Sequence, residues 1–169
     1  MNIEIRQISE NDIIGFQKCL DSVAQEGKYL AIENAPDLEK IKSFITNNIS
    51  NNFPQYVAIE NDKIIGWCES IPFQIKPLRH RAGLAMGVTK AMRKKGIGES
   101  LLIATLRHAE EIGIKRIDLE VRADNESAIS LYRKTGFKEY ARKKLGIFHE
   151  GKFHDLIAME YLMQKNGVI

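Results

Sequence analysis

The hexapeptide RKKGIG, residues 93–98, places three cations and two glycines directly before an apolar, amphipathic stretch. A helix N-terminus already carries partial positive charge, so further cations there are unfavourable unless an anion binds. Glycines let backbone N–H groups approach a phosphate, and the free N–H groups of a first helical turn then point at it. The segment therefore predicts a phosphate-binding turn, with a tight strand-to-helix turn as the structural alternative.

Two common phosphate-binding motifs do not fit this segment. A Walker loop requires Gly-Lys-Ser/Thr after its spacer, and this sequence is missing here. A dinucleotide fingerprint requires a third glycine three residues after Gly98, where the chain has Leu101, and a second βαβ half. The sequence around the turn is nevertheless basic, because no acidic residue occurs between Glu69 and Glu99. The cations of that interval are Lys76, Arg79, Arg81, Lys90, Arg93, Lys94 and Lys95. They favour an anionic ligand, and a solvated basic loop is the alternative.

The elements that position this turn follow from the spacing of apolar residues. We expect strands at residues 2–8, 55–60, 63–70, 82–88, 116–121, 138–148 and 152–163. We expect helices at residues 12–26, 38–48, 126–135 and from the hexapeptide to about residue 112. This order predicts an α/β (α+β) fold, with a mixed, mostly antiparallel twisted sheet of six to seven strands flanked by about four helices.

Composition places the chain among ordinary globular proteins. Its 169 residues predict one domain over residues 1–169, with 44% hydrophobic and 28% charged residues. No apolar run approaches the roughly 20 residues of a membrane span, and the polar N-terminus does not resemble a signal peptide. Cys19 and Cys68 have neither metal-ligand nor disulfide-framework spacing. We therefore expect a cytoplasmic protein that binds no metal, membrane or nucleic acid.

The hexapeptide and a second segment together resemble the GNAT superfamily of acetyl-CoA-dependent N-acetyltransferases. That superfamily has Arg/Gln-x-x-Gly-x-Gly/Ala after a strand and at the start of a helix, which RKKGIG matches. The second segment, LEVRADNESAISLYRKTGF (Leu119–Phe137), is similar to its Asn, Ala-Ile-x-Leu-Tyr and Gly-Phe signature. The resemblance extends from Ile3 to Met163 and implies the GNAT-like acyl-CoA N-acyltransferase fold.

The resemblance implies acetyl-CoA as co-substrate. Its pyrophosphate is expected on the backbone of the glycine turn, and its pantetheine arm along the preceding strand and beside an asparagine. The implied cofactor-binding residues are Met86, Gly87, Val88, Arg93, Lys94, Lys95, Gly96, Ile97, Gly98, Glu99 and Asn125. Gly87 within a strand fits a close backbone or ligand approach, or else a bulge, and Asn125 also fits a helix N-cap.

Acetyl transfer to an amine requires a base and an acid. An alkyl amine has a pKa on the order of 10, so a base must remove a proton before the amine attacks a thioester. The resemblance implies Glu120 as this base and Tyr132 as the acid that protonates the departing thiolate. The structural alternatives are a strand ion pair for Glu120 and a core aromatic for Tyr132. Glu69 or a chain of water molecules also remains open as the base.

The sequence therefore predicts an N-acetyltransferase that moves the acetyl group of acetyl-CoA directly to a primary amine of a small molecule or a peptide or protein N-terminus. An acyl-CoA-binding sensor domain without turnover is the alternative, which the presence of both Glu120 and Tyr132 disfavours. The acceptor side has no strongly acidic cluster in the sequence, which disfavours highly cationic acceptors. Tyr29, Trp67, Phe73 and His149 are further acceptor-side candidates, and the long final strands are candidates for pairing in a homodimer.

Overall fold

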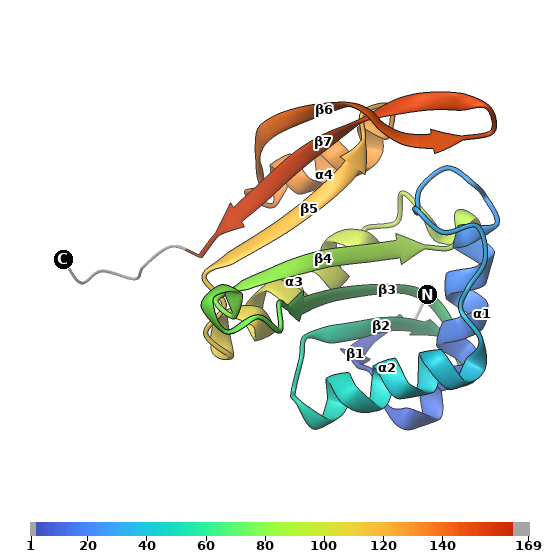
Figure 1. Cartoon of the computed structure of the whole chain (residues 1–169). Helices are drawn as coiled ribbons and strands as arrows, with labels where there is room; N and C mark the ends of the chain where they lie inside the picture. The colour runs from blue at the N-terminus through green and yellow to red at the C-terminus, as the bar shows by residue number, and fades with distance from the viewer. Residues whose placement is uncertain (1–2, 164–169) are drawn as a thin grey trace.

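A seven-stranded mixed sheet forms the centre of the computed structural model, which describes residues 3–163. Its strand order is β1-β2-β3-β4-β5-β7-β6 (Figure 1). The strands are β1 (Glu4–Gln7), β2 (Gln55–Glu60), β3 (Lys63–Pro72), β4 (Arg81–Val88), β5 (Arg116–Arg122), β6 (Lys138–His149) and β7 (Lys152–Leu162). β4 and β5 are parallel, and the other neighbouring pairs are antiparallel. The predicted fold class is confirmed, although residue 2 of the predicted first strand lies outside the described residues.

Four helices cover the two faces of this sheet. They are α1 (Ile13–Ala24), α2 (Leu38–Ser50), α3 (Ile97–Glu111) and α4 (Glu126–Lys134), with single-turn helices η1 (Glu10–Asp12), η2 (Lys76–Leu78) and η3 (Lys90–Met92). In Figure 1, α1 and α2 lie in front of β1 to β3, whereas α3 and α4 lie behind the sheet. Gly113 and Gly136 follow α3 and α4 with φ of 87° and 100°, the left-handed conformation that commonly ends a helix.

Each face of the sheet has its own hydrophobic core. In front, the ring of Phe16 on α1 meets Trp67 of β3 edge-on, with centroids 5.9 Å apart. Behind, Cys68 of the same strand packs among α3 residues such as Leu101 and Leu102. Successive strand residues point to opposite faces, so the burial of both Trp67 and Cys68 is explained by a strand covered on two sides.

The sheet is open in its middle, between β4 and β5. The two strands pair only at their beginnings, where Arg81–Gly83 lies opposite Arg116–Asp118. Beyond these residues they separate (Figure 1), while β5 continues to pair with β7 along its whole length. The resulting gap lies beside the N-termini of α3 and α4 and the loop that follows α1.

The hairpin of β6 and β7 bends so that its tip reaches the loop between α1 and α2. The bend coincides with a register shift between Lys143 and Ile147, where Leu145 has φ of 54°. At the tip, the His149 ring packs so closely on Gly27 that a Cβ on this glycine would lie 2.5 Å from Nε2. The loop after α1 and the hairpin therefore meet at one end of the gap.

Candidate functional site

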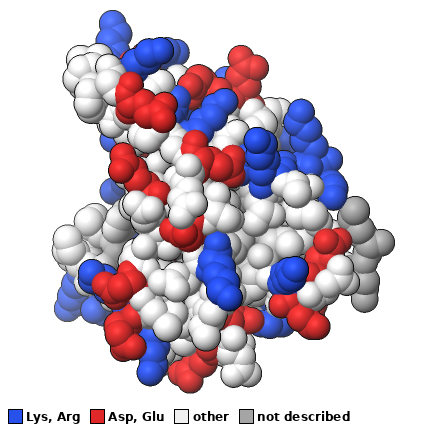
Figure 2. Space-filling model, turned by 90° about the vertical axis from the view of Figure 1, so that its right-hand side faces the viewer, with Lys and Arg blue, Asp and Glu red and all other residues white. Residues whose placement is uncertain are grey.

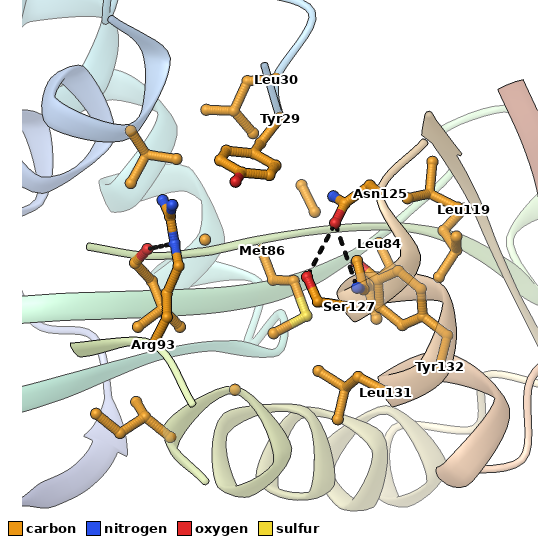
Figure 3. A pocket seen from close by; sticks show the side chains of 18 of the residues that line it. Tyr29, Leu30, Leu84, Met86, Arg93, Leu119, Asn125, Ser127, Leu131 and Tyr132 are labelled. Carbon is orange, nitrogen blue, oxygen red and sulfur yellow. Dashed lines mark hydrogen bonds between the residues drawn. The ribbon is translucent and has the colours of Figure 1, made fainter. Parts of the chain in front are cut away.

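A cavity of about 560 Å³ occupies the gap between β4 and β5 (Figure 3). A volume of this size is typical of small-molecule and cofactor sites. Its walls are the second half of β4, the middle of β5, the first turn of α3, the first two turns of α4, and residues 29–31 of the loop after α1. Of the predicted cofactor-binding residues, all except Lys95 line it, and so do both predicted catalytic residues, Glu120 and Tyr132.

The turn before α3 has the geometry of an anion cradle. Gly96 is the N-cap of α3 in the left-handed conformation, with φ of 79°, and a Cβ added there would meet no atom within 4 Å. Ser100 N–H makes a helical hydrogen bond to the Gly96 carbonyl at 3.1 Å. The N–H groups that precede it in the first turn have no acceptor within the helix. The open space and these donors fit the pyrophosphate of acetyl-CoA.

Two of the three cationic side chains of the turn contact other groups of the protein. Arg93 is bound to Glu26 and to the Val88 carbonyl, and the Nζ of Lys95 lies 3.5 Å from the Met92 sulfur. Arg81, another cation of the acid-free interval, binds Asp118. Figure 2, which views the right-hand end of Figure 1, shows cations and carboxylates interspersed. The basic interval in the sequence therefore does not become an uninterrupted basic surface there.

Gly87 is explained by packing within the sheet. A Cβ at this position would lie 2.3 Å from the ring of Trp67, and the pairing of β3 with β4 is regular there. Close approach of a neighbouring group is therefore the reason for the glycine, and the neighbour is a side chain. The bulge that the sequence left open as an alternative is not found. Trp67 is accordingly a core residue, only 2% exposed.

Asn125 begins α4 and caps it. Its side-chain Oδ1 accepts hydrogen bonds from the Ala128 N–H at 3.3 Å and the Ser127 hydroxyl at 3.2 Å (Figure 3). The predicted N-cap is confirmed, and the amide nitrogen of Asn125 is not used by either bond. Because the residue also lines the cavity, the cap fixes a hydrogen-bond donor at the cavity wall.

Tyr132 reaches the cavity from α4 while most of it is buried. It is 7% exposed and its ring packs against Phe137, with centroids 5.6 Å apart. Burial raises the pKa of the phenol above its usual value. The hydroxyl is therefore protonated at neutral pH and is a proton donor in the cavity wall.

Glu69 and Glu120 lie on strands to either side of β4, on the same face of the sheet. Glu69 is opposite Ala85 in the β3–β4 register. Since Gly83 pairs with Asp118, Ala85 and Glu120 are each two residues beyond the last pair of the separating strands. Side chains two residues apart share a face, so both carboxyl groups lie on the front face with only Ala85 in the row between them.

The two carboxyl groups have different surroundings. Glu120 is 44% exposed at its side chain and forms an ion pair with Lys143 of β6, as the structural alternative for this residue anticipated. Glu69 is partly buried and accepts a hydrogen bond of 2.9 Å from Gln55, whose oxygen accepts one of 3.0 Å from Asn48. Burial raises the pKa of Glu69 to about 8, against the opposing effect of the Gln55 bond.

The front face carries further carboxylates near Glu120. Asp118 and Glu160 lie opposite each other on β5 and β7, and Glu120 follows two residues after Asp118. With Glu69, they bring four carboxyl groups from three strands to one face. Arg81 and Arg116 bind Asp118, and Arg116 also binds Glu160. Because these arginines, and Lys143 beside Glu120, balance the charge of the carboxylates, the expectation about highly cationic acceptors stays a prediction.

Tyr29, Leu30 and Ala31 form the front wall of the cavity, opposite α4. Figure 3 shows Tyr29 and Leu30 across the cavity from Leu131 and Tyr132. Leu30 and Ala31 were missed from the sequence, because an irregular loop has no apolar period that distinguishes them. Of the other acceptor-side candidates, Phe73 packs on the Arg81 guanidinium, 5.6 Å from it, and His149 lies at the hairpin tip.

Within residues 3–163, no group of three or more His, Cys, Asp or Glu residues is arranged to hold a metal ion. In the same residues, no helix combines the length and apolar character needed to cross a membrane.

Comparisons with known proteins agree with this geometry. The N-alpha-acetyltransferase of Sulfurisphaera tokodaii is 29% identical over 141 residues, which are 69% of this chain and 84% of that protein. The mycothiol acetyltransferase of Corynebacterium efficiens is 44% identical over 52 residues, but these are 31% of this chain and only 18% of that protein. The structure of yncA from Salmonella typhimurium with acetyl-CoA shares the fold, with a TM-score of 0.91 at 18% identity, over 100% of this chain and 98% of that one.

The profile of the acetyltransferase (GNAT) family matches residues 22–137. This range is more than half of the chain, and it contains both the glycine turn before α3 and the asparagine-to-phenylalanine segment around α4. The cavity lies between these two segments. The chain therefore belongs to the acetyltransferase (GNAT) family.

Proposed function

We propose that this protein is an N-acetyltransferase that moves the acetyl group of acetyl-CoA directly to a primary amine of a small molecule or a peptide or protein N-terminus. The observation that carries this proposal is the cavity between β4 and β5. There an open phosphate cradle at Gly96, a protonated phenol at Tyr132 and the carboxyl group of Glu120 line one space. A sensor domain without turnover would not require the last two groups.

Acetyl-CoA supplies the activated acetyl thioester, and the chain offers backbone and side-chain groups to hold it. The first turn of α3 presents N–H groups to the pyrophosphate. The free edge of β4 at Met86, Gly87 and Val88 offers its backbone to the pantetheine arm in the manner of an added strand. The Asn125 amide is a further donor at the same wall. Acetyl-CoA in the structure of yncA supports this assignment.

Glu120 and Tyr132 handle the protons in this proposal. Glu120 accepts a proton from the acceptor ammonium and passes it to solvent, which is accessible to its half-exposed side chain. The amine nitrogen forms the new C–N bond, and Tyr132 donates a proton to the sulfur as the C–S bond breaks. The second proton that the nitrogen loses restores the phenol.

The acceptor class and setting are proposals as well. The name of the Sulfurisphaera tokodaii protein supports a protein N-terminus, and that of the Corynebacterium efficiens protein supports a small-molecule amine. The free, buried thiols of Cys19 and Cys68 support a cytoplasmic location. The position of β6 at the sheet edge supports pairing of two copies in a homodimer.

A panel of amines with acetyl-CoA tests the activity. It contains free amino acids, polyamines, amino sugars and short peptides with free N-termini, and the release of CoA thiol is measured. We expect sustained release with at least one class of amine, and a mass increase in that acceptor that matches one acetyl group. Binding of CoA without release for any amine would instead establish the sensor.

A further inference from the structure

The guanidinium of Arg93 connects the phosphate turn to the front wall of the cavity. Its two terminal nitrogens bind the two oxygens of Glu26, one of them at 2.8 Å, and its Nε donates to the Val88 carbonyl at 2.9 Å (Figure 3 shows the latter bond). The Tyr29 ring lies over the guanidinium, 4.5 Å from its centre. One side chain of the turn thus holds two residues of the loop after α1.

This attachment acts on the part of the loop that lines the cavity. Tyr29 and its neighbour Leu30 form the front wall. The far end of the loop is held separately, since the Ala35 N–H bonds Asp21 at 2.9 Å and Gln17 bonds the Pro36 carbonyl at 2.9 Å. At its beginning the wall is therefore held by Arg93, together with the packing of His149 on Gly27 and of Leu30 on the front core.

The bond between Arg93 and Glu26 is of a strong kind. It is bidentate and charge-assisted, and the side chains are only 26% and 21% exposed. Arg93 is also the first residue of the hexapeptide whose backbone forms the cradle. A ligand that fixes the turn consequently fixes the base of this side chain.

We propose that Arg93 is a positioning residue that couples occupation of the phosphate cradle to ordering of the front wall. Through Glu26 and Tyr29, binding of CoA stabilises the wall against which the acceptor is placed, and by linkage the acceptor strengthens CoA binding. The inference rests on the proposed function in taking this wall as the acceptor's. It assigns the Arg93 side chain to the wall and leaves the phosphate contact to the backbone of the turn.

Hydrogen exchange of residues 25–37, with and without CoA, tests this coupling in the whole protein. We expect CoA to slow exchange of this segment about tenfold in the wild type and to slow it less than about twofold in Glu26→Gln. Glu33→Gln is the matched control, because Glu33 is in the same loop and 80% exposed. Equal protection by CoA in the wild type and Glu26→Gln would overturn the coupling.

The same hydrogen-exchange measurement on Tyr29→Leu is a second test, because this substitution leaves the ion pair of Arg93 with Glu26 intact. In this variant CoA should still slow the exchange of residues 25–37, but less than in the wild type. If Tyr29→Leu changes this protection no more than Glu33→Gln does, the Tyr29 ring takes no part in the coupling. With an amine that the wild type acetylates, Glu26→Gln should raise the acceptor KM about tenfold while the Kd of CoA changes less than threefold. A large change in the Kd of CoA with an unchanged acceptor KM would instead indicate that the Arg93 side chain binds the phosphates. If CoA protects the loop but no amine is acetylated, the proposed function is rejected and the coupling stands. If the protein does not bind CoA, the proposed function and the coupling are both rejected.

Discussion

The two ends of the cavity are built in different ways. At the end where we propose that the phosphates bind, here called the phosphate end, the chain offers backbone groups: the N–H groups after Gly96 and the free edge of β4. At the end where we propose that the acceptor binds, it uses side chains from separate elements, among them Tyr29 of a loop and Glu120 of β5. The first end is one turn of contiguous sequence, whereas the second exists only after the sheet has formed.

This difference teaches which changes each end tolerates. Backbone donors keep their chemistry when a neighbouring side chain is replaced, provided that the new residue accepts the same φ and leaves the space open. Side-chain groups depend on register, because a slip of one residue turns every side chain to the other face. Substitutions at the phosphate end should therefore act through space and charge, and those at the acceptor end through chemistry.

The strongest test of the backbone end is Gly96→Glu. A carboxylate at the open side of Gly96 is placed against an anionic ligand, and like-charge contact costs several kcal/mol. We expect the Kd of CoA to rise about 1,000-fold, measured by calorimetry. Gly113→Glu is the matched control, since Gly113 has the same left-handed backbone and open surroundings at the other end of α3. Equal CoA binding by both variants would place the phosphate elsewhere.

Tyr132→Phe tests whether the phenol acts in the acetyl transfer and not in the binding of CoA. Loss of the phenol proton should lower kcat about 100-fold, while the Kd of CoA stays within threefold because the ring still packs on Phe137. Steady-state kinetics and calorimetry measure the two quantities. An unchanged kcat would show that water or another group protonates the sulfur.

A comparison of Glu69→Gln and Glu120→Gln over a range of pH identifies which of the two carboxyl groups is the base. If Glu120 is the base, Glu120→Gln should lower kcat/KM at least about tenfold at pH 7, and Glu69→Gln should have the smaller effect. If Glu69 is the base, kcat/KM of the wild type should rise with pH through about 8, the raised pKa of Glu69. That rise should then disappear in Glu69→Gln, with the same amine as acceptor.

Stability gives an independent check of the state of Glu69. Its pKa of about 8 in the folded protein lies above the roughly 4.3 expected when unfolded. Between these pH values Glu69 is protonated in the folded state but not in the unfolded state. The stabilisation that this protonation gives the folded protein is therefore complete below about pH 4 and is lost as pH rises through 8. Glu69→Gln should flatten the decline of Tm over this range, and a parallel decline in both proteins would contradict the assignment.

Gly87→Ala should have the smallest effect on chemistry, and it acts on packing instead. The added Cβ meets the Trp67 ring, and overpacking of this kind costs about 1–3 kcal/mol, or roughly 3–10 °C in Tm. Gly83→Ala is its control, because Gly83 lies on the same face of β4 with nothing within 4 Å of the added atom. Equal Tm values for the two variants would refute the packing explanation.

Much of the phosphate end was predictable from the sequence, for local reasons. A turn, a cap or a helix start is decided by neighbours within a few residues, so the turn RKKGIG and the cap at Asn125 could be predicted from the sequence. The attachment of Arg93 to Glu26 was not, because 67 residues separate the partners. The sequence showed a cation near a phosphate turn and could not show that its carboxylate partner follows α1.

By itself the sequence determined the order of strands and helices, the glycine turn and the identity of the groups available for proton transfer. Only the tertiary structure decided that β4 and β5 separate after Gly83, which turns a continuous sheet into a binding gap. It also decided that Glu69 and Glu120 lie on the same face of the sheet, and that burial gives Glu69 a pKa different from that of a free carboxyl group. Local hydrogen bonding and periodicity act along the chain, whereas register, burial and charge pairing depend on residues that folding brings together.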